Sequence, residues 1–377
     1  MKICHIVLTG GPCAGKTTAL SKINEFASGF GYKVISVPET ATEIISAGIA
    51  PGPLMSVDDF QRLLMSMQLD KYRLYNKAAE MIGGKTLVVH DRGLLDSKAY
   101  MSLQAWQELL QQFNKTEAGI WEMYNAVFHL VTAAKGAEQA YTTANNTARS
   151  ESAQKARELD GKTLSAWNGH PHLRCIDNST DFNGKIMRLL AELSVVLGVP
   201  EPREIERKFL IEKPNLAQLA LQSNCTQVDI IQIYLHGKNS EERRIRRRAY
   251  KNGASYTLTS KKAVGGSERT EIERSITSKE FDELLIQADP NCEPIRKKRY
   301  CLMWNNRYYE IDVYPTAQNA IMEIELTSAG ERFEIPPGIK IIKEVTTEKG
   351  FSNAHIARHG MPGELSGEKR TEYGKTT

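Results

Sequence analysis

The sequence lacks paired cysteines, long apolar runs and a strong excess of either charge. Its six cysteines are scattered, with no Cys-x-x-Cys pair and no zinc spacing, which is typical of reduced thiols in a cytoplasmic protein. No apolar run approaches the roughly 20 residues that span a bilayer, so no transmembrane segment is expected, although peripheral membrane contact stays open. The net charge of +4 is small for 377 residues and argues against a nucleic-acid partner.

What the sequence does have is the composition of a globular protein, with 41% hydrophobic and 25% charged residues. A chain of 377 residues is too long for one ordinary core. The segment Val199-Pro200-Glu201-Pro202 cannot continue a helix and predicts a boundary. We therefore expect a first domain at residues 1–199, a second at 200–359 and a flexible tail at 360–377.

The first half alternates short apolar runs with long amphipathic stretches, which predicts an α/β domain: a parallel sheet with helices on both faces. The expected strands are Ile3–Leu8, Lys33–Val37, Thr86–His90, Ala126–Val131 and Leu173–Ile176. The expected helices include Lys16–Ser28, Asp58–Met81 and Gly184–Leu197.

In the second half the apolar period changes to two, which predicts an antiparallel sheet. The expected strands are Arg203–Ile211, Val228–Leu235, Glu241–Tyr250, Ser255–Lys261, Arg269–Ile276, Ile295–Trp304, Arg307–Tyr314 and Ala320–Leu326, with Ile339–Glu344 as a candidate last strand. A helix is expected at Ser278–Gln287, with Ser278 as its N-cap.

A phosphate-binding motif follows the first expected strand. The residues Gly10, Gly11, Pro12, Cys13, Ala14, Gly15, Lys16 and Thr17 read G-x-x-x-x-G-K-T and are followed by Thr18 and a helix. Backbone N–H groups and the helix N-terminus would hold nucleotide phosphates, and Lys16 would contact the outer ones. The Thr17 hydroxyl can bind Mg²⁺. The alternative, a glycine-rich turn with a chance lysine, does not explain the strand before the motif and the helix after it.

Two carboxylates end neighbouring strands at the edge of the sheet where ligands bind. Asp91, before Arg92 and Gly93, is placed like a Walker-B aspartate that holds Mg²⁺, or it caps the next helix. Glu39, before Thr40 and Ala41, could act as a general base, or it caps the helix that follows.

Arg149 and Arg157 lie in a polar stretch before the last strand, where small-molecule kinases carry a mobile lid whose arginines neutralise transferred phosphate. The alternative is that both are exposed helix arginines. The segment Asn114-Lys115-Thr116-Glu117 is similar to a guanine-selecting motif, but it follows a helical run and is interpreted as a helix terminus. The sequence therefore does not choose between ATP and GTP.

By these residues the first half resembles the P-loop domain shared by bacterial nicotinamide-riboside kinases and the TRP-like-channel translocation-defect proteins. The glycine-rich loop, Glu39-Thr40-Ala41, Asp91-Arg92-Gly93 and the Trp167-Asn168-Gly169-His170-Pro171-His172 segment carry the likeness. It implies nucleotide binding and a kinase-like or NTPase activity.

In the second half an isoleucine repeatedly lies between two like charges, as in Glu204-Ile205-Glu206, Arg244-Ile245-Arg246 and Glu323-Ile324-Glu325. Because residues i and i+2 of a strand share one face, each of these strands has one charged and one apolar face. The simplest interpretation is a sheet with its charges in water. Acidic and basic strands both occur, however, so we favour a barrel whose charged interior binds phosphate and divalent cations.

This half resembles the CYTH family, the triphosphate tunnel metalloenzymes, by its E-x-E-x-K opening at Glu204–Lys208 and by the strands that follow in the family's order. The likeness implies an α+β, eight-stranded antiparallel tunnel barrel that uses Mg²⁺ or Mn²⁺. Carried over to this sequence, the phosphate ligands would be Lys208, Arg244, Arg246, Lys261, Arg269, Lys297 and Arg299. The metal-side carboxylates would be Glu204, Glu206, Glu323 and Glu325, to which the interior pattern adds Glu271, Glu273 and Asp312.

Together these features predict a Mg²⁺-dependent phosphohydrolase or phosphotransferase that binds ATP or GTP and, in its tunnel, a triphosphate or polyphosphate. The alternative is a regulatory or trafficking protein with little catalysis that binds GTP and an anionic phospholipid, phosphatidic acid or a phosphoinositide. On the expected strand at Glu241–Tyr250, Arg243 and Arg247 point away from the tunnel and could meet lipid headgroups or nucleic acid, although a solvated strand end also explains them.

Overall fold

A computed structural model of the protein describes residues 2–53, 55–140, 152–199, 205–236, 242–251, 253–265, 268–305, 307–326 and 332–366. Of several residues, those at 261–265, 268–272 and 275 among them, only the backbone is described. Contacts divide the chain into two compact units, Met1–Glu204 and most of the chain from Ile205 onward.

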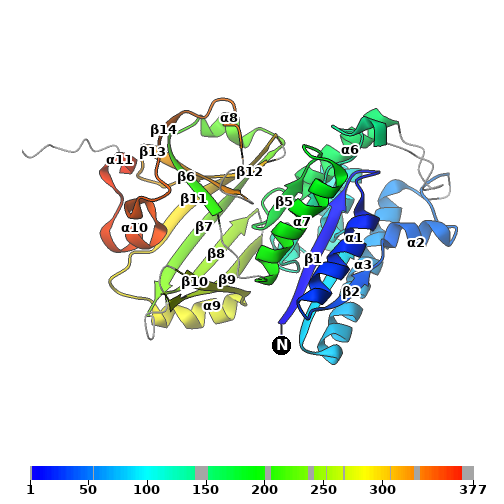
Figure 1. The fold of residues 1–377 in the computed structure, drawn as a ribbon, viewed down its shortest axis with the longest axis horizontal. Coiled ribbons are helices and arrows are strands. Elements are labelled where there is room, and N and C mark those ends of the chain that lie inside the picture. Colours follow the sequence, from blue (N-terminus) through cyan, green and yellow to red (C-terminus); the bar gives the residue numbers. More distant parts are fainter. Residues whose placement is uncertain are drawn as a thin grey trace, which may run out of the picture. The chain divides into compact units, whose positions relative to one another are not determined.

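The first unit contains a five-stranded parallel sheet in the order β2-β3-β1-β4-β5 (Figure 1). Its strands are β1 Lys2–Gly10, β2 Lys33–Val37, β3 Lys85–Asp91, β4 Ala126–Leu130 and β5 Leu173–Ile176. The central strands are apolar along their length because both of their faces are covered, and every residue of β4 is buried. The predicted α/β class is confirmed.

Helices cover both faces of this sheet. They are α1 Lys16–Gly29, α2 Thr40–Ser46, α3 Val57–Ile82, α4 Leu103–Gln112, α5 Glu117–Trp121, α6 Ala153–Ala166 and α7 Phe182–Leu197, with 3₁₀ turns η1 Leu94–Tyr100 and η2 Glu138–Ala140. On one face, Ile23 of α1 and Leu189 of α7 pack in one core cluster with Ile6 of β1. On the other, Ala79 of α3 packs against Val88 of β3. Asn114, at φ 50°, turns the chain from α4 to α5, as expected for a helix terminus.

The second unit contains an antiparallel sheet in the order β10-β9-β8-β7-β11-β12-β13-β6-β14. Its strands are β6 Ile205–Glu212, β7 Cys225–Leu235, β8 Glu242–Tyr250, β9 Gly253–Gly265, β10 Glu268–Ser275, β11 Ile295–Trp304, β12 Arg307–Val313, β13 Asn319–Leu326 and β14 Ile341–Glu344. The predicted antiparallel class is confirmed. The described part of the sheet has nine strands rather than the expected eight, because β14 adds a short strand beside β6.

Apolar clusters pack on both faces of this second sheet. The isoleucine face packs in two clusters: Ile311 and Ile324 lie with Leu219 of α8, and Ile245 lies with Phe281 of α9. The opposite face carries the charged residues and ends in a third apolar cluster, in which Ile321 meets Ile356 of α10. The covering segments are α8 Leu216–Ala220, α9 Ser278–Leu284, η3 Leu285–Gln287, η4 Lys349–Phe351, α10 Asn353–His359 and α11 Gly363–Ser366.

The predicted N-cap of α9 is wrong by one residue. Thr277 takes that place: its hydroxyl accepts from Glu280 N at 3.1 Å, and the Glu280 carboxylate accepts from Thr277 N at 2.9 Å. A threonine followed three residues later by glutamate forms this reciprocal capping box, which makes Thr277 the N-cap and Ser278 the first residue of the helix.

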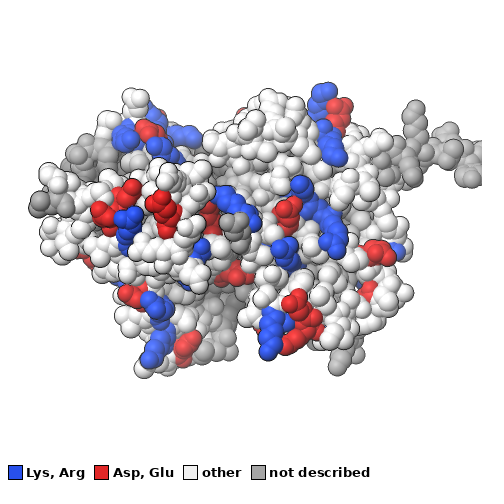
Figure 2. Space-filling view, turned by 180° about the vertical axis from the view of Figure 1, so that it is seen from behind, with Lys and Arg blue, Asp and Glu red and all other residues white. Residues whose placement is uncertain are grey.

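The distribution of surface charge and the state of the cysteines agree with the expectations from composition. On the face drawn in Figure 2, blue and red side chains are interspersed rather than gathered by sign. All six cysteines lie in the described residues and none forms a disulfide. In the part of the chain that the structure describes, no helix has both the length and the apolar character needed to cross a bilayer.

Candidate functional site

The phosphate-binding loop leaves the carboxyl end of β1, the middle strand of the first sheet, and ends at Lys16, the first residue of α1. Gly10, at φ +139°, lies so close to β4 that a Cβ on it would be 2.0 Å from the carbonyl oxygen of Leu130. Gly15 adopts φ +86°, in the left-handed region that glycine tolerates. The two glycines therefore have steric reasons to be glycine. Lys16 is buried and Thr17 is exposed.

Two buried charged side chains from distant helices hold this loop. The carboxylate of Asp160, on α6, accepts from Gly11 N at 2.8 Å and from Thr132 N at 3.1 Å. The ammonium group of Lys185, on α7, donates to the carbonyl of Ala14 at 3.1 Å and to that of Val131 at 2.7 Å. Burial lowers the pKa of Lys185 to about 8, against the opposing pull of Asp160. Contacts from α6 and α7 thus hold the loop in this conformation.

Glu39 ends β2 and forms an ion pair with Arg92, with Arg92 Nε at 3.1 Å from Glu39 Oε1. Its other oxygen accepts from the hydroxyl of Thr42 at 2.8 Å. Burial would raise the pKa of Glu39, but Arg92 and Lys16 outweigh it and hold the pKa at about 2. Glu39 is the N-cap residue of α2, yet its side chain makes no capping hydrogen bond. Glu39 thus occupies the capping position without a capping bond from its carboxylate, which lies as a fixed anion beside Lys16.

Asp91 ends β3, next to Arg92, which adopts φ 74°. Its Oδ1 atom is buried and accepts no hydrogen bond from any described residue. Burial raises the pKa of Asp91, while Lys16 acts in the opposite direction. The N-cap of the following 3₁₀ turn is Gly93, so Asp91 does not cap it. The structure thus brings Lys16, Glu39 and Asp91 into one electrostatic cluster, as the sequence predicted.

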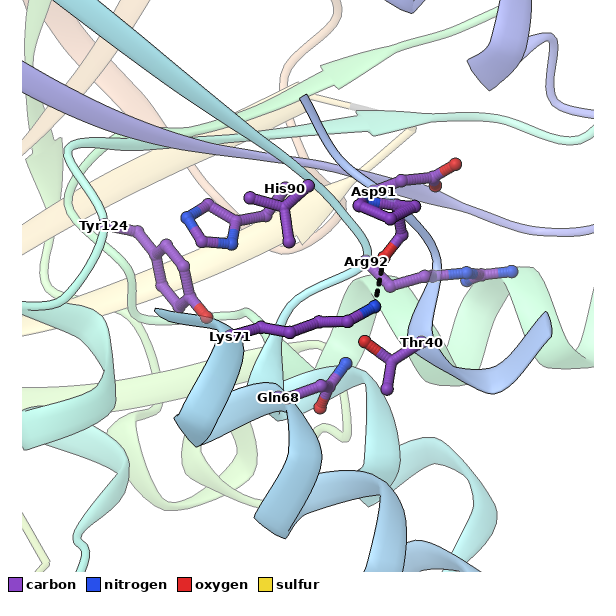
Figure 3. Close-up of a pocket in the computed structure, with 9 residues that line it drawn as sticks. Thr40, Gln68, Lys71, His90, Asp91, Arg92 and Tyr124 are labelled. Carbon is purple, nitrogen blue, oxygen red and sulfur yellow. Dashed lines mark hydrogen bonds between the residues drawn. The ribbon is translucent and has the colours of Figure 1, made fainter. Parts of the chain in front are cut away.

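A small pocket lies beside this cluster, under α3. Figure 3 shows its lining, in which Lys71 and Gln68 come from α3, and His90, Asp91 and Arg92 lie at the end of β3. Lys71 pairs with Glu43 at 2.5 Å and donates to the carbonyl of Pro38 at 3.2 Å.

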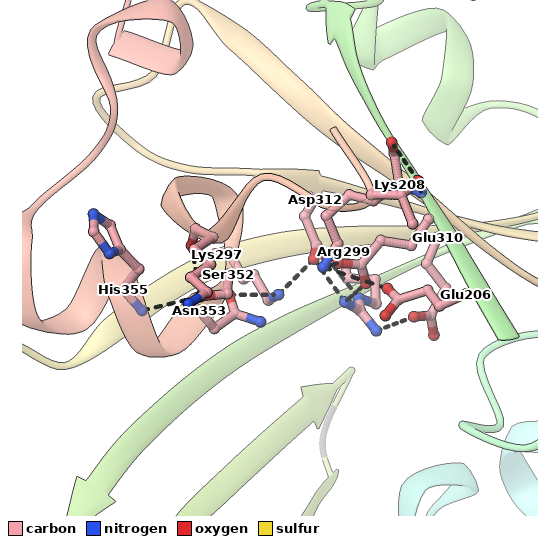
Figure 4. A network of polar contacts seen from close by, with 12 residues as sticks. Glu206, Lys208, Lys297, Arg299, Glu310, Asp312, Ser352, Asn353 and His355 are labelled. Atoms are coloured by element: carbon pink, nitrogen blue, oxygen red, sulfur yellow. Dashed lines mark hydrogen bonds and ion pairs between the residues drawn. The ribbon is translucent and has the colours of Figure 1, made fainter. Parts of the chain in front are cut away.

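In the second unit a buried network of ion pairs occupies the charged face of the sheet (Figure 4). Asp312 on β12 has no exposed surface and pairs with two cations of β11. Lys297 Nζ lies 2.5 Å from Asp312 Oδ2, and Arg299 donates to both carboxylate oxygens, at 2.7 and 2.6 Å. Arg299 also pairs with Glu310. Burial would raise the pKa of Asp312, but Arg299 and Lys297 keep it well below its usual range.

The network continues through Glu323 on β13. Its carboxylate accepts from Arg299 at 3.0 Å and lies 2.8 Å from Lys208 Nζ on β6, which is also 3.4 Å from Glu206. In strand register, Glu323 is opposite Lys208 and Glu325 is opposite Glu206. The charged members of these strands therefore share one face of the sheet, on which Lys208 and Glu323 are partly buried and Glu325 is exposed, and the isoleucines share the other face.

The arginines of β8 form a separate part of the same face. Arg246 lies opposite Gln232 of β7 and donates to its Oε1 atom at 3.3 and 3.4 Å. Arg248 is buried and Arg244 is half-buried. Burial, and then the neighbouring Arg244, lower the pKa of Arg246 to about 10. Arg246 is repelled by Arg244, Arg299 and Arg248 and attracted by Glu273.

Comparison with protein families matches both units. Residues 5–185 match the family model described as an AAA domain, and residues 202–359 match the one described as a CYTH domain. The chain joins an AAA domain of the P-loop class to a CYTH domain.

A search of curated proteins returned no match. Among solved structures, the chain is similar to an inorganic triphosphatase, NE1496, at 25% identity over 43% of this chain and 98% of that chain, with a TM-score of 0.30. It is also similar to the Pyrococcus horikoshii proteins PH1012 and PH1819, each at 18% identity over 34% of this chain and 80% of that chain, with TM-scores of 0.25 and 0.27. At these TM-scores, function has to be argued from the residues themselves.

The predicted site residues of the CYTH domain are not all described. Glu204 lies outside the described residues, as does Arg149 of the AAA domain, and for Lys261, Arg269 and Glu271 the backbone alone is described. In register, Lys261 lies between Glu242 of β8 and Glu271 of β10. Glu273 is exposed and accepts from the Thr259 hydroxyl at 2.8 Å.

No three His, Cys, Asp or Glu side chains of the described residues are grouped so that they could hold a metal ion. Asp312 accepts hydrogen bonds from both Lys297 and Arg299. These contacts suit a residue that orients the two cations, and they do not suit a metal ligand. Glu206 and Glu325, opposite each other on β6 and β13, keep the oxygen chemistry that Mg²⁺ and Mn²⁺ prefer. Mg²⁺ is commonly held by one or two carboxylates together with substrate phosphates, which fits this pair.

Sequence reasoning missed several residues of the AAA domain site, notably Asp160, Lys185 and Asp96. Asp96 accepts from the Thr9 hydroxyl at 2.7 Å and from Trp167 Nε1 at 2.6 Å. Lys185 could have been noticed in the sequence, because it lies on the apolar face of an amphipathic helix, where a lysine needs a buried partner. Arg157, expected to face transferred phosphate, donates to the carbonyl of Ala134 at 2.9 Å.

Proposed function

We propose that the AAA domain binds ATP or GTP with Mg²⁺ and that the CYTH domain binds a triphosphate with a divalent cation and hydrolyses it. The observation that carries the proposal is the composition of the charged face. Arginines of β8 lie on it, and the carboxylates of β6 and β13 lie on the same face. A triphosphate needs both, because its charge is met partly by cationic side chains and partly by a metal ion.

In the CYTH domain the side chains divide into two roles. Arg244, Arg246 and Arg248 would donate to phosphate oxygens, and Glu206 with Glu325 would hold Mg²⁺ or Mn²⁺ together with the terminal phosphate. A bound divalent ion supplies Lewis-acid polarisation of the phosphoryl group and a more acidic water. Asp312 would keep Lys297 and Arg299 in place and compensate their charge before the anion arrives.

In the AAA domain, the backbone of the loop and Lys16 would hold the outer phosphates of the nucleotide. Thr17 and Asp91 are the candidate ligands of Mg²⁺. Glu39 has a pKa of about 2 and is paired with Arg92, so it would act by its charge and position. Whether the phosphoryl group goes to water or to a hydroxyl acceptor distinguishes an NTPase from a kinase.

The test uses two arginines of the same strand. Arg246→Ala removes a side chain of the charged face, whereas Arg247→Ala, one residue further, removes one from the opposite face of β8. Loss of charge-assisted hydrogen bonds should weaken tripolyphosphate binding about 10- to 100-fold in Arg246→Ala. Arg247→Ala should bind normally. Binding is measured by calorimetry, and turnover by phosphate release with Mg²⁺ or Mn²⁺.

Equal effects of the two substitutions would refute a phosphate site on the charged face. ATP and GTP binding should be unchanged in Arg246→Ala, because the P-loop lies in the other domain. If the wild-type protein releases no phosphate from tripolyphosphate, ATP or GTP but binds phosphatidic acid or phosphoinositide vesicles, the regulatory alternative replaces the enzymatic one. In that case Arg247→Ala, on the outer face, should weaken vesicle binding more than Arg246→Ala does.

A further inference from the structure

The aromatic ring of Phe182 lies against the P-loop of the AAA domain. Phe182 is the first residue of α7, and the far end of its ring fills the space beside Gly15. A Cβ on Gly15 would lie 2.6 Å from Phe182 Cε2 and 3.1 Å from Phe182 Cζ, well inside the roughly 3.5–4.0 Å of ordinary carbon contacts. The glycine therefore makes room for an aromatic ring where the loop meets α1.

The same residue is open to solvent. Phe182 has 45% of its surface exposed, although phenylalanine is among the residue types that are most often buried. A single exposed phenylalanine is not unusual on a protein surface. What distinguishes Phe182 is its place, because its ring is held at the phosphate-binding loop while nearly half of the residue stays accessible to a ligand.

The strand order indicates which end of a nucleotide would meet this ring. The strand that carries the P-loop, β1, lies between β3 and β4. Asp91, the candidate Mg²⁺ ligand, ends β3, so the outer phosphates and the metal would lie on that side of the loop. The base is the other end of the nucleotide and would extend toward β4 and β5. Phe182 follows β5 in the chain, and α7 packs beside α1, so the ring lies on the side of the base.

The polar side chains that directly follow β5 are engaged within the protein. Asp177 Oδ1 accepts from Arg188 at 2.7 Å. Asn178 Oδ1 accepts from Lys185 at 2.8 Å, and the Asn178 amide nitrogen donates to the carbonyl of Thr132 at 2.8 Å. The edge of a base would have to displace these contacts in order to use the same atoms, whereas an aromatic ring offers its face without displacing any. The arrangement favours recognition of the face of the base.

We propose that Phe182 stacks on the base of the nucleotide that the P-loop holds and is a specificity-determining residue of this site. The proposal rests on the nucleotide binding proposed above and adds the part of the ligand that the phosphate loop does not contact. Stacking is tolerant of base identity because every base has a π-face, so ATP and GTP should both gain from it. The AAA domain would thereby favour nucleoside triphosphates over triphosphates that lack a base, which are the ligands proposed for the CYTH domain.

The test compares two exposed phenylalanines of the AAA domain. Phe182→Ala removes the ring at the P-loop, whereas Phe30→Ala removes a ring that is 38% exposed and lies about 20 Å away, after the 14 residues of α1. Binding to the full-length protein is measured by displacement of a fluorescent ATP that is labelled on its ribose. Only the signal that Lys16→Ala abolishes is counted, so that binding in the CYTH domain does not enter. Phe182→Ala should weaken ATP and GTP binding about 5- to 150-fold, and Phe30→Ala less than about twofold.

The competitor is varied as well. Ribose 5-triphosphate has the phosphates and the sugar of ATP but no base, so Phe182→Ala should change its binding less than about twofold. Equal losses for ATP and ribose 5-triphosphate would mean that the ring only supports the loop at Gly15, and would overturn the proposal. If Phe182→Ala does not fold, as judged by circular dichroism, Phe182→Leu replaces it. Leucine keeps an apolar contact with Gly15 but has no aromatic face, so ATP binding should still weaken at least about threefold.

The remaining outcomes separate the two proposals. If the wild-type protein shows no Lys16-dependent binding of ATP or GTP, nucleotide binding itself fails, and the stacking fails with it. If the wild-type protein binds them and Phe182→Ala binds them equally well, the stacking alone is refuted.

Discussion

Replacing Asp312 by asparagine would keep the shape of the side chain and remove the charge that Lys297 and Arg299 share. Asp312 has no exposed surface, and both cations are buried as well. Removing one partner of a buried ion pair costs about 3–5 kcal/mol, because the remaining charge is left uncompensated away from water. Two cations depend on Asp312, so we expect the upper part of that range.

The loss should be confined to the CYTH domain and is measured there. Native-state hydrogen exchange of the β11 and β12 amides reports the free energy of opening of this sheet. The method is chosen because a protein of two domains need not unfold in a single transition. Asp282→Asn, an exposed aspartate of α9, is the control and should leave exchange within about 0.5 kcal/mol of the wild type.

The same variant has a second expected outcome. With Asp312 neutral, Lys297 loses its carboxylate partner and Arg299 keeps only Glu310 and Glu323, so tripolyphosphate should stabilise Asp312→Asn by more than it stabilises the wild-type protein. A loss below about 1 kcal/mol without ligand would contradict the structural role given to Asp312. No greater stabilisation by tripolyphosphate would contradict the assignment of Lys297 and Arg299 to the phosphate-binding face.

Two further predictions concern the AAA domain. Because the pKa of Lys185 is lowered to about 8, the unfolded chain binds more protons than the folded one between about pH 8 and pH 10, and the free energy of unfolding should rise with pH by up to about 3 kcal/mol in that window. Urea titrations should show that Lys185→Met loses this rise, and an equal rise in both proteins would refute the assignment. Gly10→Ala should destabilise the domain by roughly 3 kcal/mol or more, since its Cβ would lie 2.0 Å from the Leu130 oxygen. Gly29→Ala, where nothing lies within 4 Å, should be neutral, and similar thermal shifts in the two variants would contradict this reasoning.

Much of the architecture could be predicted because it depends on patterns of residues that are close together in the sequence. The strands of the first sheet agree with the apolar runs to within a few residues, since a strand buried on both faces must be apolar throughout. The isoleucine alternation placed Ile311 and Ile324 on the packed face, because side chains of a strand alternate in direction. The P-loop was found because it needs particular residues at fixed spacing.

The roles of individual charges could not be predicted in the same way. Asp312 and the cations of β11 belong to the same alternating pattern as Glu206 and Glu325, and the pattern gave all the acids one role. In the structure these acids have different neighbours. Asp312 lies opposite Ile321, which belongs to an apolar cluster at one end of the charged face. Glu325 lies opposite Glu206 instead. Burial and the choice of partner set the surroundings of each carboxylate, and neither can be read from the alternating pattern.

The amino-acid sequence by itself determined the two kinds of domain, the phosphate loop and the sides of the strands, because each depends on residues near one another in the chain. The tertiary structure decided which side chains meet. Asp160 and Lys185, on helices far along the chain, hold the P-loop. Gln68 and Asp91 each have a buried oxygen that accepts no hydrogen bond from any described residue. Such contacts join residues whose distance is set only when helices pack on a sheet, and no local pattern encodes that distance.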